Sequence, residues 1–571
     1  MKKIPYALAN FEVLKQGDYY FVDKTQYIPV LENNVCSIFL RPRRFGKSLW
    51  CSILECYYDI SRASVFHRLF AETSIGRSPT PSHSSNLVLK LNFSTVKASL
   101  KLEELEDSFD RSFANALDEF LFRYQTFFGD GHRIREQPNA TERMKKLISM
   151  ITTESLPRLY LIVDEYDNFT NQLLASMREA DYKTLTTSDS FLRTFFKAIK
   201  AGCEDGAIHR MFMTGVLPIT IDDLTSGFNI GKNVSFRPES VSMLGFTEDE
   251  VVKYVDAVFA DYGFDNSLRR RVLSDMKAYY DGYLFSPDGG EHLYNSTICN
   301  GYLQELINNG GKLPARTIDT NVKPDIAWLA VMERKGRYVE EFLQQIIGRN
   351  EAVPVSADKV YEQMSAGKFF SADYFAICLY YLGLLTFKDE FSLGVPNLSV
   401  SRILLDYYQE VHSAKSSALS SAIFSTALRD FIHTRDWKAL FGVYWENYIR
   451  RVFPAKLFAY VNEAFFQTLF FGFCIDRLSN RYSIRIEENH FSGTSDFLAI
   501  PMPGENAKIC LMEFKYVSKK KVSSVTETFV NKAKAQARDY LNDISLRYPN
   551  LPVEGLVVII KGNTGVEYHQ L

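Results

Sequence analysis

The fold of this chain is decided by one stretch, Arg41-Pro42-Arg43-Arg44-Phe45-Gly46-Lys47-Ser48. Residues 37–40, which precede it, have the composition of a short buried strand, and residues 49–58, which follow it, have the pattern of a helix. A glycine, a lysine and a hydroxyl residue between a strand and a helix form a cradle for phosphate, because the backbone N–H groups at the helix start point at phosphate oxygens. The stretch therefore predicts a phosphate-binding loop within an α/β fold.

Each side chain of this loop has an expected role in nucleotide binding. Lys47 adds positive charge at the β- and γ-phosphates, and Ser48 can ligate Mg²⁺. Arg41 stands where such loops usually begin with glycine, which removes one permissive backbone position. The alternative is a chance Gly-Lys-Ser triplet in a basic turn. The residues expected to contact the nucleotide here are Arg43, Arg44, Phe45, Gly46, Lys47, Ser48 and Leu49.

A second element weakens that alternative. Residues 161–165 read Leu-Ile-Val-Asp-Glu, an apolar strand that ends in two carboxylates. We expect Asp164 to hold Mg²⁺ through water and Glu165 to polarise the water that attacks ATP. An ordinary strand that ends in a solvated acidic turn would have the same pattern. The two motifs together, in this order, predict a site for ATP and Mg²⁺.

Two further strand candidates fit the same sheet. Residues 87–93 lie between the two motifs, and residues 210–215 follow them. An extra strand between the motifs is typical of a class of P-loop ATPases in which a polar residue at a strand end lies near the γ-phosphate. Thr214 matches that sensor position, and the alternative is a threonine that only caps its strand.

These motifs form part of an ordered series that resembles the AAA-ATPase-like domain. The loop sequence itself is typical of that family, so Arg41 is no sign of a decayed site. The resemblance implies ATP binding and hydrolysis, and it implies fusion to a PD-(D/E)XK nuclease domain, which is common among such proteins. The motifs that carry it are Ile4-Pro5-Tyr6, Tyr20-Phe21-Val22-Asp23-Lys24-Thr25, Arg41 to Ser48, Asp164-Glu165-Tyr166-Asp167, Thr214-Gly215-Val216, Gly245-Phe246-Thr247 and Tyr280-Asp281-Gly282-Tyr283.

The expected nuclease site includes Glu513-Phe514-Lys515, in which an acid and a lysine two residues apart on a strand share one face. Asp496 starts the preceding strand candidate, and a turn lets it lie beside Glu513. Two carboxylates and the Phe514 carbonyl form an oxygen site suited to Mg²⁺ or Mn²⁺. Lys515 is expected to orient the nucleophilic water or to stabilise charge at the phosphorus. The alternative for Glu-x-Lys on an edge strand is a cross-strand ion pair.

Other residues support the nuclease interpretation through the resemblance. Glu463 lies on a helix before the sheet, where this superfamily often places a further acid. Gln536 and Tyr540 share one face of the following helix, 525–540, and resemble the Gln-x-x-x-Tyr motif of some members. Residues 519–521 are three lysines that either bind a nucleic-acid backbone or form a solvated strand end.

Bulk properties set limits on this interpretation. With 571 residues the chain is too long for one core. Its net charge of −2 gives no general attraction to nucleic acid, so any DNA contact must come from a local patch. The eight cysteines are scattered, with no C-x-x-C pair, which argues against zinc and against a disulfide framework. The N-terminus lacks the apolar run of a signal peptide, and residues 464–475 are too short to span a bilayer, so we expect an intracellular protein, cytoplasmic or nuclear, with no membrane partner.

We therefore expect an α/β protein of three parts. These are a P-loop NTPase domain at 1–245, a helical and winged-helix-like region at 246–440, and a restriction-endonuclease-like α/β domain at 441–571. The winged-helix expectation rests on a helix at 374–385 that leads into a β-hairpin ending near residue 400. The expected function is ATP hydrolysis coupled to metal-dependent cleavage of nucleic acid, with DNA preferred, in a protein that can form homo-oligomers. The alternative is an ATP-driven switch whose C-terminal domain only binds nucleic acid or a partner.

Overall fold

The computed structural model divides by its internal contacts into two compact units. The first contains Met1–Leu313, Ala327–Lys335 and Pro354–Asn397, and the second contains Pro314–Ile326, Gly336–Val353 and Leu398–Leu571. The boundaries at residues 245 and 440 stay predictions. The structure describes residues 1–98, 101–186, 190–223, 229–288, 290–314, 327–335, 342–343, 345–346, 352–356, 358–413, 421–453, 455, 457–479, 481–502 and 504–571.

A five-stranded parallel sheet forms the centre of the first unit, in the order β2-β3-β4-β1-β5. The four strands predicted there are confirmed. β1 (Cys36–Leu40) and β3 (Leu159–Asp164) are buried throughout, as expected for parallel strands that are covered on both faces. β2 (Leu87–Asn92) and β4 (Ile208–Gly215) flank β3, while β5 (Gly231–Asn233) was not predicted.

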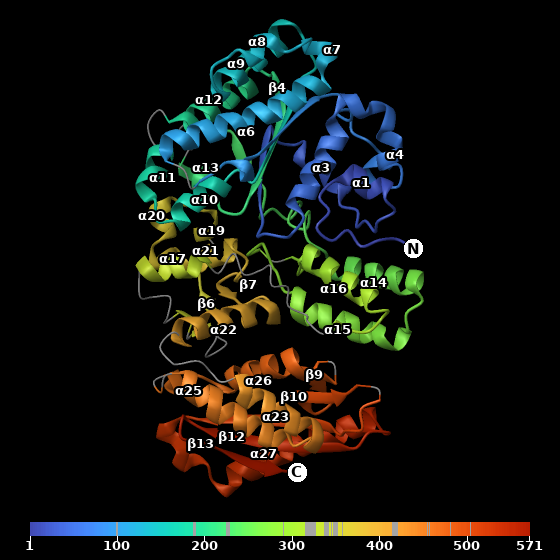
Figure 1. Ribbon diagram of the computed structural model, residues 1–571, viewed down its shortest axis with the longest axis vertical. Helices are drawn as coiled ribbons and strands as arrows, with labels where there is room; N and C mark the ends of the chain where they lie inside the picture. Colours follow the sequence, from blue (N-terminus) through green and yellow to red (C-terminus); the bar gives the residue numbers. More distant parts are fainter. Residues whose placement is uncertain are drawn as a thin grey trace. The chain divides into compact units, whose positions relative to one another are not determined.

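Helices cover this sheet on both sides (Figure 1). α3 (Lys47–Tyr58) packs on it through Tyr58, whose ring stacks on that of Tyr160 with the centroids 4.0 Å apart. α9 (Ala140–Thr153) and α12 (Phe191–Glu204) pack together on the other side. The remaining helices of this part are α1 (Phe11–Gln16), α2 (Ile28–Leu31), α4 (Phe66–Phe70), α5 (Ser74–Arg77), α6 (Leu102–Arg123), α7 (Gln125–Phe128), α8 (His132–Arg135), α10 (Asn168–Ala175), α11 (Glu179–Thr186) and α13 (Ile219–Asp223).

Beyond residue 245 the first unit is mainly helical, as predicted. Thr247 begins α14 (Glu248–Tyr262) with a capping box, in which its hydroxyl accepts from the Glu250 N–H and the Glu250 carboxylate accepts from the Thr247 N–H. The helices that follow are α15 (Arg269–Tyr280), α16 (Ser296–Asn308), α17 (Ala327–Lys335), α19 (Asp358–Tyr361), α20 (Ala366–Phe369) and α21 (Phe375–Tyr381).

A helix followed by a hairpin lies at the predicted place, with different bounds. α21 ends at Tyr381, before the expected end, because Gly383 takes a φ of +76° just beyond the helix. The hairpin consists of β7 (Thr386–Asp389) and β8 (Ser392–Gly394). The expected strand as far as residue 400 is wrong, because α22 (Leu398–Ser413) begins two residues after Pro396. The winged-helix assignment stays a prediction.

The second unit is built on a mixed five-stranded sheet in the order β13-β12-β11-β10-β9. The strands predicted to carry Asp496 and Glu513 are both present, and β13 is an addition at the edge. β11 and β12 pair in parallel, while the other pairs are antiparallel. The strands are β9 (Tyr482–His490), β10 (Gly493–Pro501), β11 (Ile509–Val517), β12 (Val553–Lys561) and β13 (Gly565–Gln570).

Two layers of helices enclose this sheet. α27 (Glu527–Arg547) buries Ala537 and Ile544 against an apolar face that includes Leu498 and Leu511. On the other face the ring of Phe497 packs in a tilted arrangement against that of Phe470 on α26 and edge-on against that of Trp437 on α24. The remaining helices of this unit are α23 (Ser421–Thr434), α24 (Trp437–Tyr444), α25 (Arg450–Val452) and α26 (Glu463–Leu478).

Two expectations about the chain as a whole can be compared with the structure. The apolar residues 464–475 lie within α26, and among the described residues no helix combines the length and apolar character needed to cross a bilayer. All eight cysteines are free thiols, and all except Cys203 are buried.

Candidate functional site

The phosphate-binding loop joins β1 to α3, where the sequence placed it. Gly46 is the N-cap residue of α3 and has a φ of +94°, a conformation that glycine adopts without strain. Arg44 also has a positive φ, of +71°. The loop therefore turns sharply before the helix begins at Lys47, so that the free N–H groups of the first helical turn face the loop.

The Lys47 side chain is buried inside the curve of the loop. Its ammonium group donates to the carbonyl oxygens of Arg41 and Pro42, at 2.8 and 2.9 Å. Burial lowers the pKa of Lys47, and the nearby carboxylates of Glu165 and Asp164 oppose that shift. The structure thus brings the loop lysine and the two acids of β3 into one site.

Asp164 lies in a row of register partners across the sheet. Asn92 is its partner on β2, Thr214 is its partner on β4, and Phe39 on β1 is in turn the partner of Thr214. Ser48 hydrogen-bonds to the Asp164 carboxylate, whose pKa is raised by burial. Its Oδ1 atom is buried and has no hydrogen-bond partner among the described residues. An unpartnered buried carboxylate oxygen beside a serine hydroxyl fits a hard cation such as Mg²⁺.

The other predicted acid and the predicted sensor lie close by. Glu165 has a φ of +51° and its carboxylate accepts from the Asn168 amide at 2.6 Å. The Thr214 hydroxyl donates to the Phe39 carbonyl of β1 at 2.7 Å, a contact of the strand-capping kind. The roles of Glu165 toward water and of Thr214 toward the γ-phosphate stay predictions.

The remaining residues assigned to nucleotide contact differ in exposure. Arg43 is exposed and Arg44 is half-buried, while Leu49 lies half-buried in the first turn of α3. Phe45 is buried, and its ring packs edge-on against Tyr283 at 5.0 Å between centroids. Phe45 therefore anchors the loop to the helical part of the unit. The Arg44 carbonyl adds to this anchor, because it accepts from the backbone N–H of residue 297 at the start of α16.

Arg41 has a structural role that the sequence did not reveal. Its guanidinium group is buried between the rings of Phe39 and Phe285, at 4.3 and 4.2 Å from the centroids. It donates to the carbonyls of Leu40 and Val241, and burial lowers its pKa to about 10. Among the described residues no carboxylate pairs with it. Arg41 therefore links the start of the loop to distant segments instead of facing the nucleotide.

Restoring the usual first glycine with Arg41→Gly is expected to destabilise the protein. The change empties the space between two aromatic rings, which costs about 3–5 kcal/mol for a large buried side chain. It also leaves the Leu40 and Val241 carbonyls without their donor. We expect a lower Tm in thermal unfolding without nucleotide, by roughly 2–4 °C per kcal/mol. Arg43→Gly, at the exposed neighbour, is the matched control, and equal Tm values for the two variants would contradict this role.

Asp167, the last residue of the motif Asp164-Glu165-Tyr166-Asp167, joins the ends of β3 and β4. Its carboxylate accepts from the N–H groups of Val216 and Leu217, at 3.0 and 2.7 Å, and from the Asn171 amide at 2.6 Å. Burial raises the pKa of Asp167, and these donors oppose that shift. Asp167 therefore holds the strand end that carries Thr214.

The second site forms where β10 and β11 separate. Their pairing ends with Phe497 opposite Met512. The N–H of Phe514 then donates to the Asp496 carboxylate at 2.7 Å. Asp496 and Glu513 consequently face each other from neighbouring strands, as the sequence predicted.

Lys515 connects three of the predicted residues. Its ammonium group donates to Oε1 of Glu513 at 2.9 Å and lies 3.5 Å from Oε2 of Glu463. Glu463 is the first residue of α26, and its other oxygen accepts from the N–H of Tyr516 at 3.2 Å. The ion pair between Lys515 and Glu513 is the contact expected from a Glu-x-Lys strand, and Asp496 and Glu463 extend it into a cluster.

The electrostatics of this cluster favour a cation. Burial, and then the proximity of Glu513, raise the pKa of Asp496 to about 8. Burial also raises the pKa of Glu513, although Lys515 opposes this. Burial lowers the pKa of Lys515, but its two acidic neighbours outweigh that effect and the net shift is upward.

The oxygen atoms of this cluster can be compared with the ligands that a divalent ion requires. Oε2 of Glu513 is buried without a hydrogen-bond partner among the described residues. Over the same residues, no three acidic, histidine or cysteine side chains are arranged to hold a metal by themselves. The protein ligands would therefore be two carboxylates, Asp496 and Glu513, and Mg²⁺ commonly binds through one or two carboxylates while it keeps several waters.

Gln536 and Tyr540 face the loop end of the β9–β10 hairpin. The Gln536 amide donates to the Tyr540 hydroxyl at 2.9 Å. The Tyr540 ring stacks on that of His490, with centroids 5.5 Å apart, and His490 contacts the Ser495 hydroxyl at 2.8 Å. A Cβ on Gly493 would lie 2.9 Å from the Tyr540 hydroxyl, so glycine permits this packing. Among the described residues no hydrogen bond joins Gln536 to the carboxylate pair, and its catalytic role stays a prediction.

The raised pKa of Asp496 predicts a pH-dependent stability in the absence of metal. The folded pKa of about 8 exceeds the ordinary value of 3.8, so the contribution to stability is present below about pH 4 and is lost as pH rises through 8. Asp496→Asn removes this dependence. We expect the variant to gain Tm over the parent by a few degrees at pH 9 in chelator, where about 1 kcal/mol corresponds to roughly 2–4 °C.

The measurement is the Tm difference between variant and parent across pH, with Asp539→Asn as an exposed control in the same unit. A difference that does not grow with pH would show that Asp496 ionises normally.

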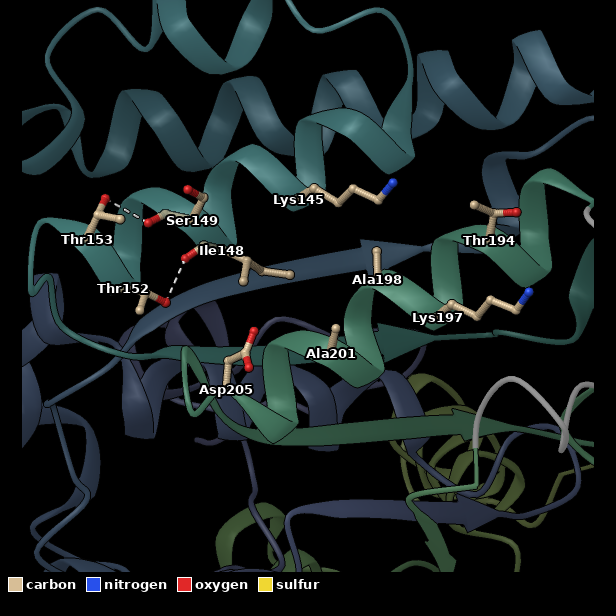
Figure 2. A pocket seen from close by; sticks show the side chains of 10 residues that line it. All are labelled: Lys145, Ile148, Ser149, Thr152, Thr153, Thr194, Lys197, Ala198, Ala201 and Asp205. Carbon is tan, nitrogen blue, oxygen red and sulfur yellow. Dashed lines mark hydrogen bonds between the residues drawn. The ribbon is translucent and has the colours of Figure 1, made fainter.

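A groove of about 580 Å³ lies between α9 and α12 and contains no residue of either site (Figure 2). Ile148 and Ala198 project into it. The hydroxyls of Thr152 and Thr153 donate back to the carbonyls of Ile148 and Ser149 in their own helix. The groove identifies no ligand, and we assign it no function.

Comparisons with known proteins match both parts of the chain. Residues 5–225 match the family described as "Predicted AAA-ATPase", and residues 461–570 match the "PD-(D/E)XK nuclease superfamily". A protein of Azotobacter chroococcum mcd 1, described as "Uncharacterized protein in vnfD 5'region", is 26% identical over 300 residues, which is 52% of this chain and 50% of that protein. The matched region thus spans about half the length of that relative. The candidate residues of the first site all lie within 5–225 and those of the second within 461–570, so the chain combines a match to the predicted AAA-ATPase family with a match to the PD-(D/E)XK nuclease superfamily.

Proposed function

We propose that this protein hydrolyses ATP at the loop after β1 and cleaves nucleic-acid phosphodiesters, preferably in DNA, at the site between β10 and β11. The observation that carries the nuclease part is the cluster of Asp496, Glu513 and Lys515, in a region that matches a nuclease superfamily. Two raised carboxyl pKa values and one unpartnered carboxylate oxygen support a divalent cation as its cofactor.

Each residue of the nuclease cluster has a chemical task in this proposal. Asp496 and Glu513 would hold Mg²⁺ or Mn²⁺, which would supply Lewis-acid polarisation of the phosphate and activation of the attacking water at neutral pH. Lys515 donates to the attacking water or to the phosphate oxygens, where negative charge develops. Glu463 keeps the Lys515 ammonium group on the side of the carboxylates, because it is the second acid within 4 Å of it.

At the nucleotide site Lys47 neutralises charge on the β- and γ-phosphates, and Ser48 and Asp164 hold Mg²⁺. Glu165 accepts the proton of the attacking water. The support is the row formed by Asp164 and Thr214 next to the loop, and the hydrogen bond between Ser48 and Asp164. We further propose that ATP turnover regulates cleavage, that the protein forms a homo-oligomer, and that nucleic acid is its partner.

The test uses purified full-length protein in a factorial design. Labelled single-stranded and duplex DNA and RNA are incubated with and without ATP, and with Mg²⁺, Mn²⁺ or chelator, while phosphate release is measured in parallel. We expect metal-dependent cleavage of DNA and metal-dependent release of phosphate from ATP. Nucleic-acid binding without cleavage under every condition would favour instead an ATP-driven switch whose C-terminal domain only binds.

A further inference from the structure

The proposed nuclease site lies at a fork in the sheet, the point where two pairs of strands diverge. β10 continues to pair with β9 as far as Gly493 opposite His490, and β11 continues to pair with β12 as far as Val517 opposite Lys561. β10 and β11, however, pair with each other only as far as Phe497 and Met512. Two strand pairs therefore diverge from the carboxylate pair, one carrying Asp496 and the other carrying Glu513 and Lys515. We name them the β9–β10 arm and the β11–β12 arm.

The β9–β10 arm ends in a fully exposed aromatic ring. Phe491 lies at the hairpin tip with a relative exposure of 102%, the highest among the large apolar side chains of the described residues. Full exposure leaves both faces of the Phe491 ring in water, so covering a face with another apolar or aromatic surface is favourable. Phe491 precedes Asp496 by five positions, so at about 3.3 Å per residue their Cα atoms lie within roughly 17 Å of each other.

The tip is held in place, so the exposed ring belongs to a fixed structure. The Asp543 carboxylate on α27 accepts from both the N–H and the hydroxyl of Ser492, at 3.0 and 2.6 Å. On the other side of Phe491, His490 stacks on Tyr540, which lies one turn earlier on the same helix. Both neighbours of Phe491 are thus anchored to α27, and the phenylalanine alone points away. Such preorganisation reduces the entropy lost when a ligand binds.

The β11–β12 arm ends in positive charge. Residues Lys519, Lys520 and Lys521 follow β11 in one turn of 3₁₀ helix and are all exposed. None of them pairs with a carboxylate among the described residues. Lys519 lies against the turn after β12, because a Cβ atom added to Gly562 in that turn would lie 3.0 Å from the Lys519 backbone N. The two arms therefore present an aromatic surface on one side of the carboxylates and three free ammonium groups on the other.

We propose that the fork takes a DNA strand with at least one unpaired base beside the cleaved phosphate, stacks that base on Phe491, and holds the backbone on the three lysines. This inference rests on the proposed nuclease function and names its substrate class. A base inside an intact duplex is already stacked on both faces, so only single strands, junctions, flaps or single-stranded overhangs can cover the Phe491 ring. Lysines bind phosphate without regard to sequence, whereas stacking requires a base but tolerates any of the four.

Binding without cleavage provides the test. Anisotropy titrations with full-length protein in chelator use fluorescein-labelled single-stranded DNA, a blunt duplex of the same length, and a single strand with abasic sites. Phe491→Ala is expected to weaken single-strand binding by about 5- to 150-fold, the range of one lost base stack. Phe491→Trp should retain the parent affinity, and the blunt duplex and the abasic strand should bind both forms equally. Replacing all three lysines with alanine should weaken every DNA and reduce the salt dependence.

Leu546→Ala, at another exposed apolar residue of the same unit, is the matched control and should leave binding unchanged. Equal single-strand affinity of Phe491→Ala and the parent would overturn the proposal, and so would an equal loss for Phe491→Trp. A dimer that dissociates on Phe491→Ala in sedimentation would also overturn it, since the ring would then contact a second copy. If the parent cleaves DNA and Phe491→Ala binds like the parent, the stacking proposal is wrong and the nuclease proposal is retained. If Phe491 governs binding but no form cleaves DNA, the stacking proposal is retained and the nuclease proposal is wrong.

Discussion

Alanine at Asp496 and alanine at Lys515 are each expected to abolish measurable cleavage of nucleic acid while ATP hydrolysis continues. Loss of Asp496 removes one of two carboxylates from the metal, and a single carboxylate competes poorly with the hydration shell of Mg²⁺. Loss of Lys515 removes the charge beside the scissile phosphate, which costs about 10²–10⁴-fold in rate for a positioned group of this kind. Initial rates on labelled DNA at matched protein concentration provide the measurement.

The structure refines the choice of variants for this test. In the fold Glu513 is buried and Asp496 accepts the N–H of Phe514, so Asp496→Ala also removes a hydrogen-bond acceptor. Asp496→Asn keeps an acceptor oxygen and loses the charge, and it should be as inactive as the alanine variant. Parent-like cleavage by Asp496→Asn and by Lys515→Ala would place the activity elsewhere.

Lys47→Ala is expected to weaken ATP binding by on the order of 10²-fold, the second largest effect. The change removes charge-assisted hydrogen bonds to the β- and γ-phosphates, each worth about 1.5–3 kcal/mol. Calorimetric titration with ATP and Mg²⁺ measures the effect. An ATP affinity equal to that of the parent would remove the claim of a phosphate-binding loop.

Glu165→Gln separates binding from turnover at the same site. Its amide keeps the shape of the side chain but cannot accept a proton from water, so ATP should bind with parent affinity and hydrolysis should stop. The variant also keeps an oxygen that can accept from the Asn168 amide. If Glu165→Gln turns over ATP at the parent rate, Glu165 only orients Asn168 and another residue activates the water.

The strands that position both sites could be predicted because their apolar runs are long and are followed or ended by residues with recognisable chemical roles. β1 and β3 are buried on both faces, which leaves continuous apolar segments in the sequence. β5, by contrast, consists of Gly231, Lys232 and Asn233, and only its place beside β1 makes it a strand. β13 was missed for a similar reason, since it lies at an edge and is only half-buried. Pairing, which composition does not encode, decides such strands.

The site residues likewise divide into those that a local sequence pattern predicts and those whose role depends on distant parts of the chain. Lys47 with Ser48 and Glu513 with Lys515 are local pairs, so their spacing alone predicts that they share a site. The structural role of Arg41 depends on Phe285, which is far away in the sequence, and an arginine in a basic loop gave no sign of burial. The anchoring of the hairpin tip by Asp543 likewise joins residues that are 51 apart. Contacts of this kind follow from the fold and have no local pattern.

The position of β1 within its sheet has a consequence for the order of folding. β1 pairs with β4 and β5, and the contact between Phe39 and Thr214 spans 175 residues of chain. Closing so large a loop is slow, and the phosphate-binding loop therefore takes its final shape late. A fragment that ends before Ile208 leaves β1 without either partner strand, as an apolar segment with an open edge that favours aggregation. Expression of the ATPase part by itself should for this reason extend beyond Asn233.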